Sequence, residues 1–122
     1  MKIKRLPDSE LEVMQVIWSM EAPVPRVQIE KAMEKIHPIA QTTLITLLTR
    51  LSNKGFVRIE KIGRSSSYTP LVSQESYLAN ESQSFIEKLC GGNMNVFANA
   101  LCDSGLSKED LKELRDLLDR DL

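Results

Sequence analysis

Small hydroxyl groups and one cation recur at helical spacing between Gln41 and Asn53. On an α-helix, the leucines of this stretch form one apolar stripe. The opposite arc carries hydrogen-bonding groups with methyls and no acid, which suits close contact with a polar, negatively charged surface. Its residues are Thr42, Thr43, Thr46, Thr49, Arg50 and Asn53. Taken alone, the stretch equally fits a solvated helix that is rich in threonine, although threonine is a mediocre helix former.

Two helices are expected to precede this stretch. Ser9 and Glu12 have the spacing of a Ser-x-x-Glu capping box, which predicts the start of the first helix. Pro23 and Pro25 interrupt the apolar periodicity that follows, because proline lacks the backbone donor that a helix interior needs. Pro25 also suits the first turn of a helix, and apolar residues at helical spacing predict that helix over residues 26–36.

The third helix is expected to end at Gly55, because glycine commonly follows helix C-termini. The pattern then changes to period two: Val57 and Ile59 alternate with polar residues, and a second short strand follows Gly63 and Arg64. Three helices and a two-stranded hairpin are the order of a winged helix-turn-helix domain, here residues 1–72, and the expected fold class is mainly α (α+β). In that fold the third helix enters the DNA major groove, which favours the groove-reading interpretation of the threonine face.

The expected DNA contacts fall into two groups. Residues in the first half of the third helix are placed to touch base edges, since threonine methyls can contact thymine methyls and glutamine can pair with adenine. These residues are Gln41, Thr42, Thr43 and Thr46. Residues further along the helix and on the wing are expected to contact the DNA backbone, which positions a protein without specifying sequence. These residues are Thr49, Arg50, Lys54, Arg58, Lys61 and Arg64.

Each of these contacts has an alternative. The threonines and Gln41 can cap the helix or contact phosphate instead of bases. Arg50 can bind phosphate, or it can pair with an internal carboxylate such as that of Glu12. Any single cation of the wing can simply be solvated, because long charged side chains usually are.

Residues 73–122 are expected to form a helical tail. Glycine and serine positions divide it into helices near residues 74–90, 93–103 and 107–121, the last opened by a Ser-x-x-Asp capping box at Ser107. About fifty residues in thin helices bury too little core to stand alone. The tail can pack on the first domain or, as we expect, on a second copy in a two-fold dimer. The expected interface residues are Tyr77, Phe85, Ile86, Leu89, Phe97, Leu101, Leu111, Leu114 and Leu118.

The 122 residues suffice for one ordinary domain plus an appendage, with the composition of a soluble globular protein. No apolar run approaches the roughly 20 residues that span a bilayer, and the N-terminal stretch lacks an apolar signal core. We therefore expect a cytoplasmic protein without stable membrane association. The net charge is −1, but residues 1–70 carry 11 basic and 7 acidic groups and residues 71–122 carry 5 and 10. A polyanion is expected to meet only the front of the chain.

Catalysis, metal binding and cofactors are not indicated. The chain has one histidine, His37, and neither a Ser-His-Asp set nor a Gly-rich phosphate loop, so an enzyme is not expected. Cys90 and Cys102 stand apart from each other and from His37, whereas a structural zinc site needs about four ligands. Buried free thiols are the expectation for both cysteines.

Several stretches resemble the penicillinase-repressor family, the BlaI, MecI and CopY group of bacterial regulators. They are LPDSELEVMQVIW, TTLITLLTRLSNKGF, RSSSYTPLVS and LSKEDLKELRDLL, in that order along residues 6–118. The TLLTRLSNKG run at Thr46–Gly55 and the YTPLV run at Tyr68–Val72 are the most specific parts. The resemblance implies a dimeric winged-helix repressor that binds double-stranded DNA at inverted repeats with TACA/TGTA-like half-sites. It also implies control of resistance or stress genes.

The family's two branches release DNA in different ways, and this sequence lacks the motif of one and keeps part of the motif of the other. One branch ends in paired Cys-x-Cys motifs that bind copper, and no such pair occurs here. In the other branch a membrane sensor metalloprotease acts indirectly, and the tail is cut at an asparagine–phenylalanine bond. The matching bond here is Asn99–Ala100, which keeps the asparagine but not the phenylalanine. Ile45 is a further departure, since close relatives often carry a basic residue there, and it implies a weaker electrostatic grip and a different operator preference.

The leading hypothesis is thus a DNA-binding transcriptional repressor that acts as a homodimer on an inverted-repeat operator. A winged-helix protein-interaction module that does not touch DNA is one alternative, favoured by the near-neutral total charge and by Ile45. A thiol-based redox-sensing regulator that uses Cys90 and Cys102 is another.

Overall fold

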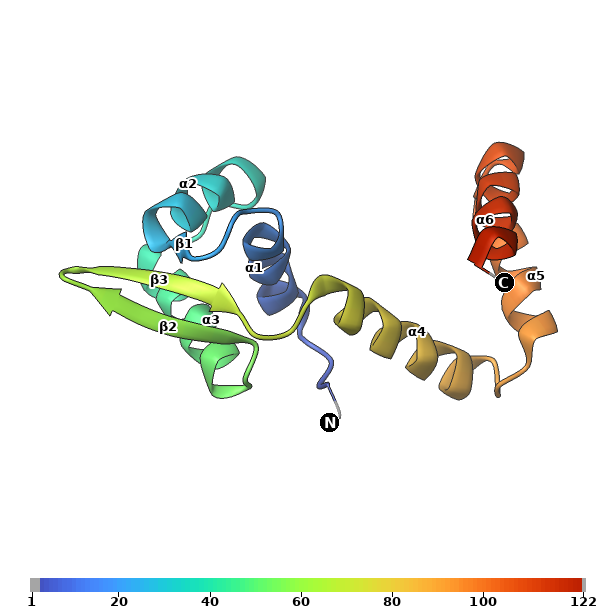
Figure 1. The fold of residues 1–122 in the computed structure, drawn as a ribbon, viewed down its shortest axis with the longest axis horizontal. Coiled ribbons are helices and arrows are strands. Elements are labelled where there is room, and N and C mark those ends of the chain that lie inside the picture. Colours follow the sequence, from blue (N-terminus) through green and yellow to red (C-terminus); the bar gives the residue numbers. More distant parts are fainter. Residues whose placement is uncertain (1–2, 122) are drawn as a thin grey trace. The chain divides into compact units, whose positions relative to one another are not determined.

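The computed structural model describes residues 3–121, except for the side chain of Asp121. The chain divides into two compact units, one that ends at Asn80 and one that begins at Glu81. Figure 1 labels the helices and strands that each unit contains. None of the helices in this described part is long and apolar enough to cross a lipid bilayer.

Helix α1 (Asp8–Trp18) follows Pro7, which is its N-cap residue. The backbone N–H of Leu11 donates to the Pro7 carbonyl at 2.9 Å, so Ser9 already lies inside the first turn. The predicted capping box of Ser9 and Glu12 is therefore wrong. Proline fixes its own φ and keeps a free carbonyl, which accepts the first helical hydrogen bond before the serine is reached.

Helix α3 (Gln41–Asn53) ends at a glycine turn, as the sequence predicted. Gly55 has a φ of +81°, a left-handed conformation that side chains with a β-carbon rarely adopt. The N–H of Gly55 donates to the Ser52 carbonyl at 3.0 Å, and the N–H of Phe56 donates to the Leu51 carbonyl at 2.9 Å. These two bonds form a Schellman motif, which ends the helix and directs the chain into the next strand.

The sheet of the described residues is antiparallel, with strands in the order β1-β3-β2. Its strands are β1 (Val24–Pro25), β2 (Val57–Ile62) and β3 (Ser65–Pro70). The prediction of a two-stranded sheet is corrected by β1, whose two residues are too few to show an alternating pattern and include a proline that only a sheet edge tolerates. Helix α2 spans Arg26–Ile36, the range that the sequence predicted, with Pro25 of β1 as its N-cap residue.

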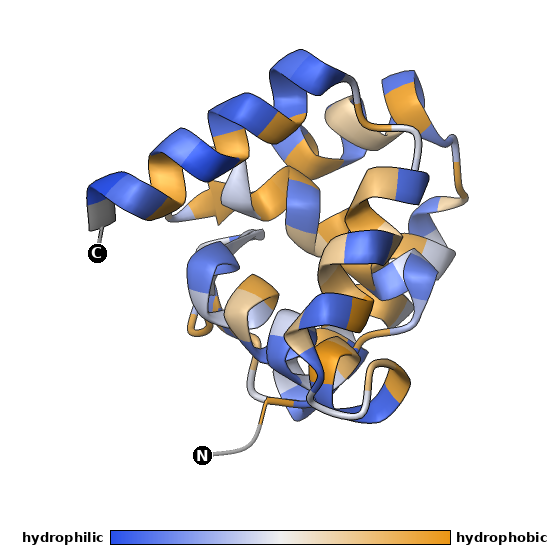
Figure 2. Cartoon of the chain, turned by 90° about the vertical axis from the view of Figure 1, so that its right-hand side faces the viewer, coloured by the Kyte–Doolittle hydropathy of each residue, from blue (hydrophilic) through white to orange (hydrophobic). Residues whose placement is uncertain are grey.

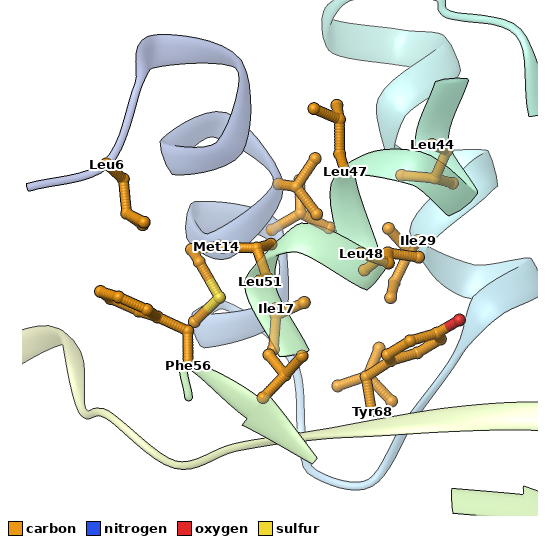
Figure 3. Close-up of a cluster of buried hydrophobic side chains, with 14 of the residues drawn as sticks. Leu6, Met14, Ile17, Ile29, Leu44, Leu47, Leu48, Leu51, Phe56 and Tyr68 are labelled. Atoms are coloured by element: carbon orange, nitrogen blue, oxygen red, sulfur yellow. The ribbon is translucent and has the colours of Figure 1, made fainter. Parts of the chain in front are cut away.

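The buried core of the first unit lies between α1, α2, α3 and the sheet (Figure 3). The leucines of α3 point into this core, together with Met14 of α1 and Ile29 of α2. The predicted apolar stripe is confirmed, because all four leucines are buried. They are Leu44, Leu47, Leu48 and Leu51.

The wing departs from the predicted alternation. Val57 is buried, but Ile59 and Ile62 are exposed. Figure 1 shows the tip of the β2–β3 hairpin extending beyond the helices, so the outer half of β2 lies outside their cover. The period-two spacing therefore predicted the strand but not how far the core extends beneath it.

The first turns of helix α4 (Gln74–Leu89) belong to the first unit. Tyr77 is only 2% exposed, and its ring centroid lies 5.7 Å from that of Trp18 and 5.9 Å from that of Phe56. Its hydroxyl oxygen accepts the backbone N–H of Leu6 at 2.9 Å. The expectation that Tyr77 lies in a dimer interface is therefore wrong, because this side chain completes the core of its own unit. That unit extends past the predicted boundary into α4.

The second unit contains the rest of α4, helix α5 (Met94–Asp103) and helix α6 (Lys108–Asp121). The predicted capping box at the start of α6 is confirmed. The Ser107 hydroxyl oxygen accepts the N–H of Asp110 at 3.0 Å, and the N–H of Ser107 donates to the Asp110 carboxylate at 3.3 Å.

Large apolar side chains of this second unit are exposed, among them Phe85, Leu89 and Leu118. The rings of Phe85 and Phe97 pack at a centroid distance of 6.0 Å. In Figure 2 the helix that ends at the C-terminus carries apolar residues along one side and polar residues along the other. The helices of the tail thus leave an apolar surface uncovered.

Candidate nucleic-acid interface

One face of α3 is exposed along the whole helix. Because the leucines of the other face are fixed in the core, the hydroxyl-bearing arc cannot turn inward. The exposed residues of this arc and of the helix start are Gln41, Thr42, Thr43, Thr46, Thr49 and Arg50. The structure therefore brings every residue that the sequence proposed on this helix to one continuous surface, which we call the α3 face.

Two hydroxyl groups of the α3 face bond within the helix. The Thr46 Oγ1 donates to the Thr42 carbonyl at 3.0 Å, and the Thr49 Oγ1 donates to the Ile45 carbonyl at 2.9 Å. Threonine in a helix often bonds in this way to the carbonyl four residues earlier. Each hydroxyl proton is used internally, so the oxygens can still accept hydrogen bonds and the methyl groups are what the face presents outward.

The N-terminus of α3 opens at the same surface. Its N-cap is Ala40, whose side chain has no oxygen to accept a bond from the first backbone N–H groups. Thr42 and Thr43 lie inside the helix, so the alternative that they cap it is wrong. Free N–H groups and the positive end of the helix dipole both favour a nearby anion.

Lys54 is held by an internal partner. Its Nζ lies 2.6 Å from Oε1 of Glu10, whose side chain is 3% exposed, while that of Lys54 is 28% exposed. A buried carboxylate depends on its counter-charge, so this lysine neutralises Glu10 at the end of α3. This pairing favours a structural role for Lys54 over the DNA backbone contact that the sequence led us to expect. Sequence reasoning missed Glu10 because a carboxylate in the first turn of a helix is usually solvated.

Arg50 does not pair with Glu12, the internal carboxylate that the sequence analysis considered. The Glu12 carboxylate lies 3.1 Å from Nδ1 of His37, at the end of α2, and not beside Arg50. No ion pair of Arg50 occurs among residues 3–121, and the side chain is exposed at the C-terminal part of the α3 face. The guanidinium is therefore available to a ligand.

The wing carries further exposed cations. Arg58 is partly neutralised, since its Nε lies 3.0 Å from Oε1 of Glu60. Lys61 lies near the end of β2 and Arg64 in the turn that joins β2 to β3, next to Gly63 at a φ of +64°. Within the described chain these two cations make no ion pair, so they are the stronger candidates for phosphate contact.

The base of the wing is fixed by a buried tyrosine. Tyr68 lies on the central strand, paired in register with Val24 of β1 and Ile59 of β2. Burial raises its pKa above the usual 10.0, and the nearby charge of Arg26 partly offsets this. The Nε of Arg26 lies 3.3 Å from Oε1 of Glu30. These groups connect the start of α2 to the central strand at the base of the wing.

The remaining predicted positions lie in the second unit. Cys90 is buried and Cys102 is exposed, both as free thiols, so the expectation of two buried thiols holds only for Cys90. Asn99 and Ala100 are exposed within α5. Among the described residues no cluster of histidine, cysteine and carboxylate side chains could hold a metal ion.

Helices α1–α3, the three strands and the exposed α3 face define a winged helix-turn-helix domain. A family model described as penicillinase repressor matches residues 6–120. The chain therefore belongs to the penicillinase repressor family, which is a family of repressors and not of enzymes.

Curated relatives agree with this family. A penicillinase repressor of Bacillus licheniformis is 34% identical over 119 residues, which cover 97% of this chain and 92% of the relative. The methicillin resistance regulatory protein MecI of Staphylococcus aureus (strain N315) is 31% identical over 121 residues, covering 98% and 97% of the two chains. The similarity thus extends through the helical tail.

Solved structures are similar to the front of the chain. The DNA binding domain of the repressor BlaI, solved in solution, matches with a TM-score of 0.55 and 36% identity, over 62% of this chain and 92% of that one. Bacillus licheniformis BlaI in its monomeric form, in complex with the blaP half-operator, matches with a TM-score of 0.53, 36% identity and the same coverage. The latter is the structure of a similar domain with DNA present.

Proposed function

We propose that this chain is a transcriptional repressor that binds an inverted-repeat operator as a homodimer. The observation that carries the proposal is the α3 face, which is exposed along the whole helix while the opposite leucines are locked in the core. The solved complex of the similar BlaI domain with a half-operator supports DNA as the ligand. The names of the relatives support a resistance operon as the target.

In this proposal α3 enters the major groove and the wing contacts the backbone. Base edges meet the first half of the α3 face: Gln41, Thr42, Thr43 and Thr46. Phosphates meet the exposed groups further along and on the wing: Thr49, Arg50, Arg58, Lys61 and Arg64. Lys54 acts through Glu10 instead, because it holds the end of the recognition helix in place.

In this proposal the helical tail forms the dimer, which joins two DNA-binding domains. Its exposed apolar side chains fit burial against a second copy, which would tie two α3 faces to one inverted repeat. Linking two binding sites raises apparent affinity through effective concentration, without any new contact to DNA. The proposed interface residues are Phe85, Ile86, Leu89, Phe97, Leu101, Leu111, Leu114 and Leu118.

Selection of bound sites from random duplex DNA by the full-length chain tests this function. We expect an inverted repeat to be enriched, and the repeat to bind more tightly than one half-site. A variant that changes Arg50→Ala on the α3 face should weaken binding, whereas Lys35→Ala on an exposed turn of α2 serves as the charge-matched control. If no sequence is enriched above the starting pool, the chain is better described as a winged-helix protein-interaction module, which its net charge of −1 and exposed Ile45 favour.

Release from the operator is proposed to follow a cut in the tail, initiated by a membrane sensor metalloprotease that acts indirectly. Removal of α6 would strip the dimer of its leucine-rich helix and lower the effective concentration of the two α3 faces. Asn99–Ala100 lies on the exposed surface of α5, within the segment where such a cut would act. The test follows the intact chain by mass spectrometry in its native cell during β-lactam exposure. Derepression while the full-length chain persists would contradict proteolytic release, and loss of that response in a Cys90→Ser/Cys102→Ser variant would then indicate a thiol signal.

A further inference from the structure

An exposed apolar residue, Ile45, lies beside the α3 face and is not among the proposed base contacts. Ile45 is 37% exposed, although isoleucine on a helix is usually buried. Its carbonyl accepts the Thr49 hydroxyl at 2.9 Å. Residues three and four apart on a helix are neighbours on its surface, so the Ile45 side chain lies beside those of Thr42 and Thr49.

The internal hydroxyl bonds make this part of the face a strip of methyl groups. The hydroxyl groups of Thr46 and Thr49 donate their hydrogen bonds to the carbonyls of Thr42 and Ile45. What they offer outward is a methyl group and an oxygen that only accepts. Beside the branched side chain of Ile45, the strip therefore presents apolar contact and acceptors, and it has no hydroxyl donor to give at Thr46 or Thr49.

Such a strip distinguishes base pairs by their major-groove edges. An A·T pair presents the adenine N7 acceptor and N6 donor, the thymine O4 acceptor and the thymine methyl; a G·C pair presents the guanine N7 and O6 acceptors and the cytosine N4 donor, and it has no methyl. Both pairs offer one amino donor to an accepting hydroxyl oxygen, so the thymine methyl is the group by which an apolar side chain such as Ile45 distinguishes them. A basic side chain at position 45 would have the opposite preference, because Lys and Arg pair with guanine.

We infer that α3 reads thymine methyl groups, and that Ile45 is a specificity-determining residue which selects an A·T pair in each half-site. The inference rests on the proposed function, since it concerns the same DNA-binding face. It adds one residue to the reading set, and it names the chemical group on the operator that this residue recognises.

The experiment uses the full-length chain and the operator obtained by selection. Each thymine of one half-site is replaced in turn by uracil, which removes one methyl and leaves every hydrogen-bonding group unchanged. Burial of a methyl is worth about fourfold to fivefold in affinity, so we expect about that loss of affinity at one or two thymines, measured by fluorescence anisotropy at fixed salt. In the Ile45→Ala variant, the same uracil substitution should cost less than twofold at the contacted position.

Matched variants separate a methyl contact from a general loss of binding. Ile36→Ala removes another exposed isoleucine, on α2, and should keep the full uracil penalty. Thr46→Val keeps the branched shape and methyls and should bind the operator better than Thr46→Ser, which keeps only the hydroxyl. The inference is overturned if uracil has no effect at any position, or if Ile45→Ala keeps the penalty unchanged. If the chain binds its selected operator tightly and shows either result, the proposed function stands and only the methyl-reading inference fails. If the chain binds no duplex DNA, both fail.

Discussion

The Nζ of Lys54 lies 2.6 Å from the Oε1 of Glu10, and this ion pair joins the residue after α3 to the first turn of α1. The Glu10 carboxylate is almost fully buried, whereas the lysine keeps partial access to water. The pair therefore fixes the C-terminal end of the recognition helix against the core, at the point where the chain turns into the wing.

Replacing Lys54→Met should destabilise the fold, because it leaves the Glu10 carboxylate buried and unpaired. We expect a loss of about 2 kcal/mol in the free energy of unfolding by urea, less than the roughly 3–5 kcal/mol of a fully buried pair, since the lysine is partly solvated. The double variant Glu10→Leu/Lys54→Met should recover most of that loss. If Lys54→Met keeps full stability but lowers the salt dependence of DNA binding, the lysine is a phosphate contact after all.

Thr46→Ala should reduce specificity more than general affinity. The change removes one methyl and one acceptor from the centre of the α3 face, and its hydroxyl bond to the Thr42 carbonyl is local. We expect a cost of about 1 kcal/mol at the selected operator and little change on random DNA. Competition binding with both DNAs measures the ratio. Equal weakening on both would show that Thr46 touches the backbone and not a base.

Lys61→Ala should reduce general DNA affinity and leave specificity unchanged, the reverse of Thr46→Ala. The lysine is exposed near the end of β2, and a phosphate contact there would release counterions without reading sequence. Binding to operator and to random DNA should weaken equally, and the slope of log K against log salt should fall by about one unit per subunit. Lys31→Ala on α2 is the control, with an unchanged slope expected. An unchanged slope for Lys61→Ala as well would remove the wing tip from the interface.

The free energy of unfolding at alkaline pH should depend on the ionisation of Tyr68. Because burial raises the pKa of this tyrosine in the folded chain above 10.0, the unfolded chain loses its proton first as the pH rises. The stabilising contribution is complete below pH 10.0 and is lost as the pH rises from there through the folded pKa. Between about pH 9 and 11, the free energy of unfolding should fall more steeply for the natural chain than for Tyr68→Phe. Parallel profiles would show that the phenol titrates alike in both states.

Local sequence signals predicted the elements that position the α3 face. Four leucines at helical spacing and a glycine beyond them determine which side of α3 is buried and where it ends, and both features depend on nearby residues. The fold class followed from the order of those elements. The predicted base-reading residues all lie on the exposed surface, because burial of one face leaves the other outside.

Features that depend on residues far apart in the chain could not be predicted from the sequence. The burial of Glu10 requires Lys54, 44 positions away, and nothing in either local pattern indicates the pair. Tyr77 and Leu78 are adjacent apolar residues at the start of α4, yet Tyr77 is buried in its own unit and Leu78 is exposed. Composition alone cannot say which of them packs within the chain. The internal bonds of Thr46 and Thr49 depend on rotamers, which a helical wheel does not specify.

Truncation tests how the chain divides into a DNA-binding unit and a dimerising tail. A fragment of residues 1–80 keeps Tyr77 against Trp18 and Phe56, and Asn80 bonded to the Ile3 carbonyl at 3.0 Å. We expect it to be a folded monomer in sedimentation equilibrium, to bind a half-site like one subunit of the full chain, and to bind the inverted repeat far more weakly than the full chain does. A fragment that ends at Ser73 loses the tyrosine and should be less stable by about 3 kcal/mol or more, because an aromatic side chain leaves the core. If the 1–80 fragment is dimeric, the interface lies in the front unit, and the exposed apolar face of the tail must serve another contact.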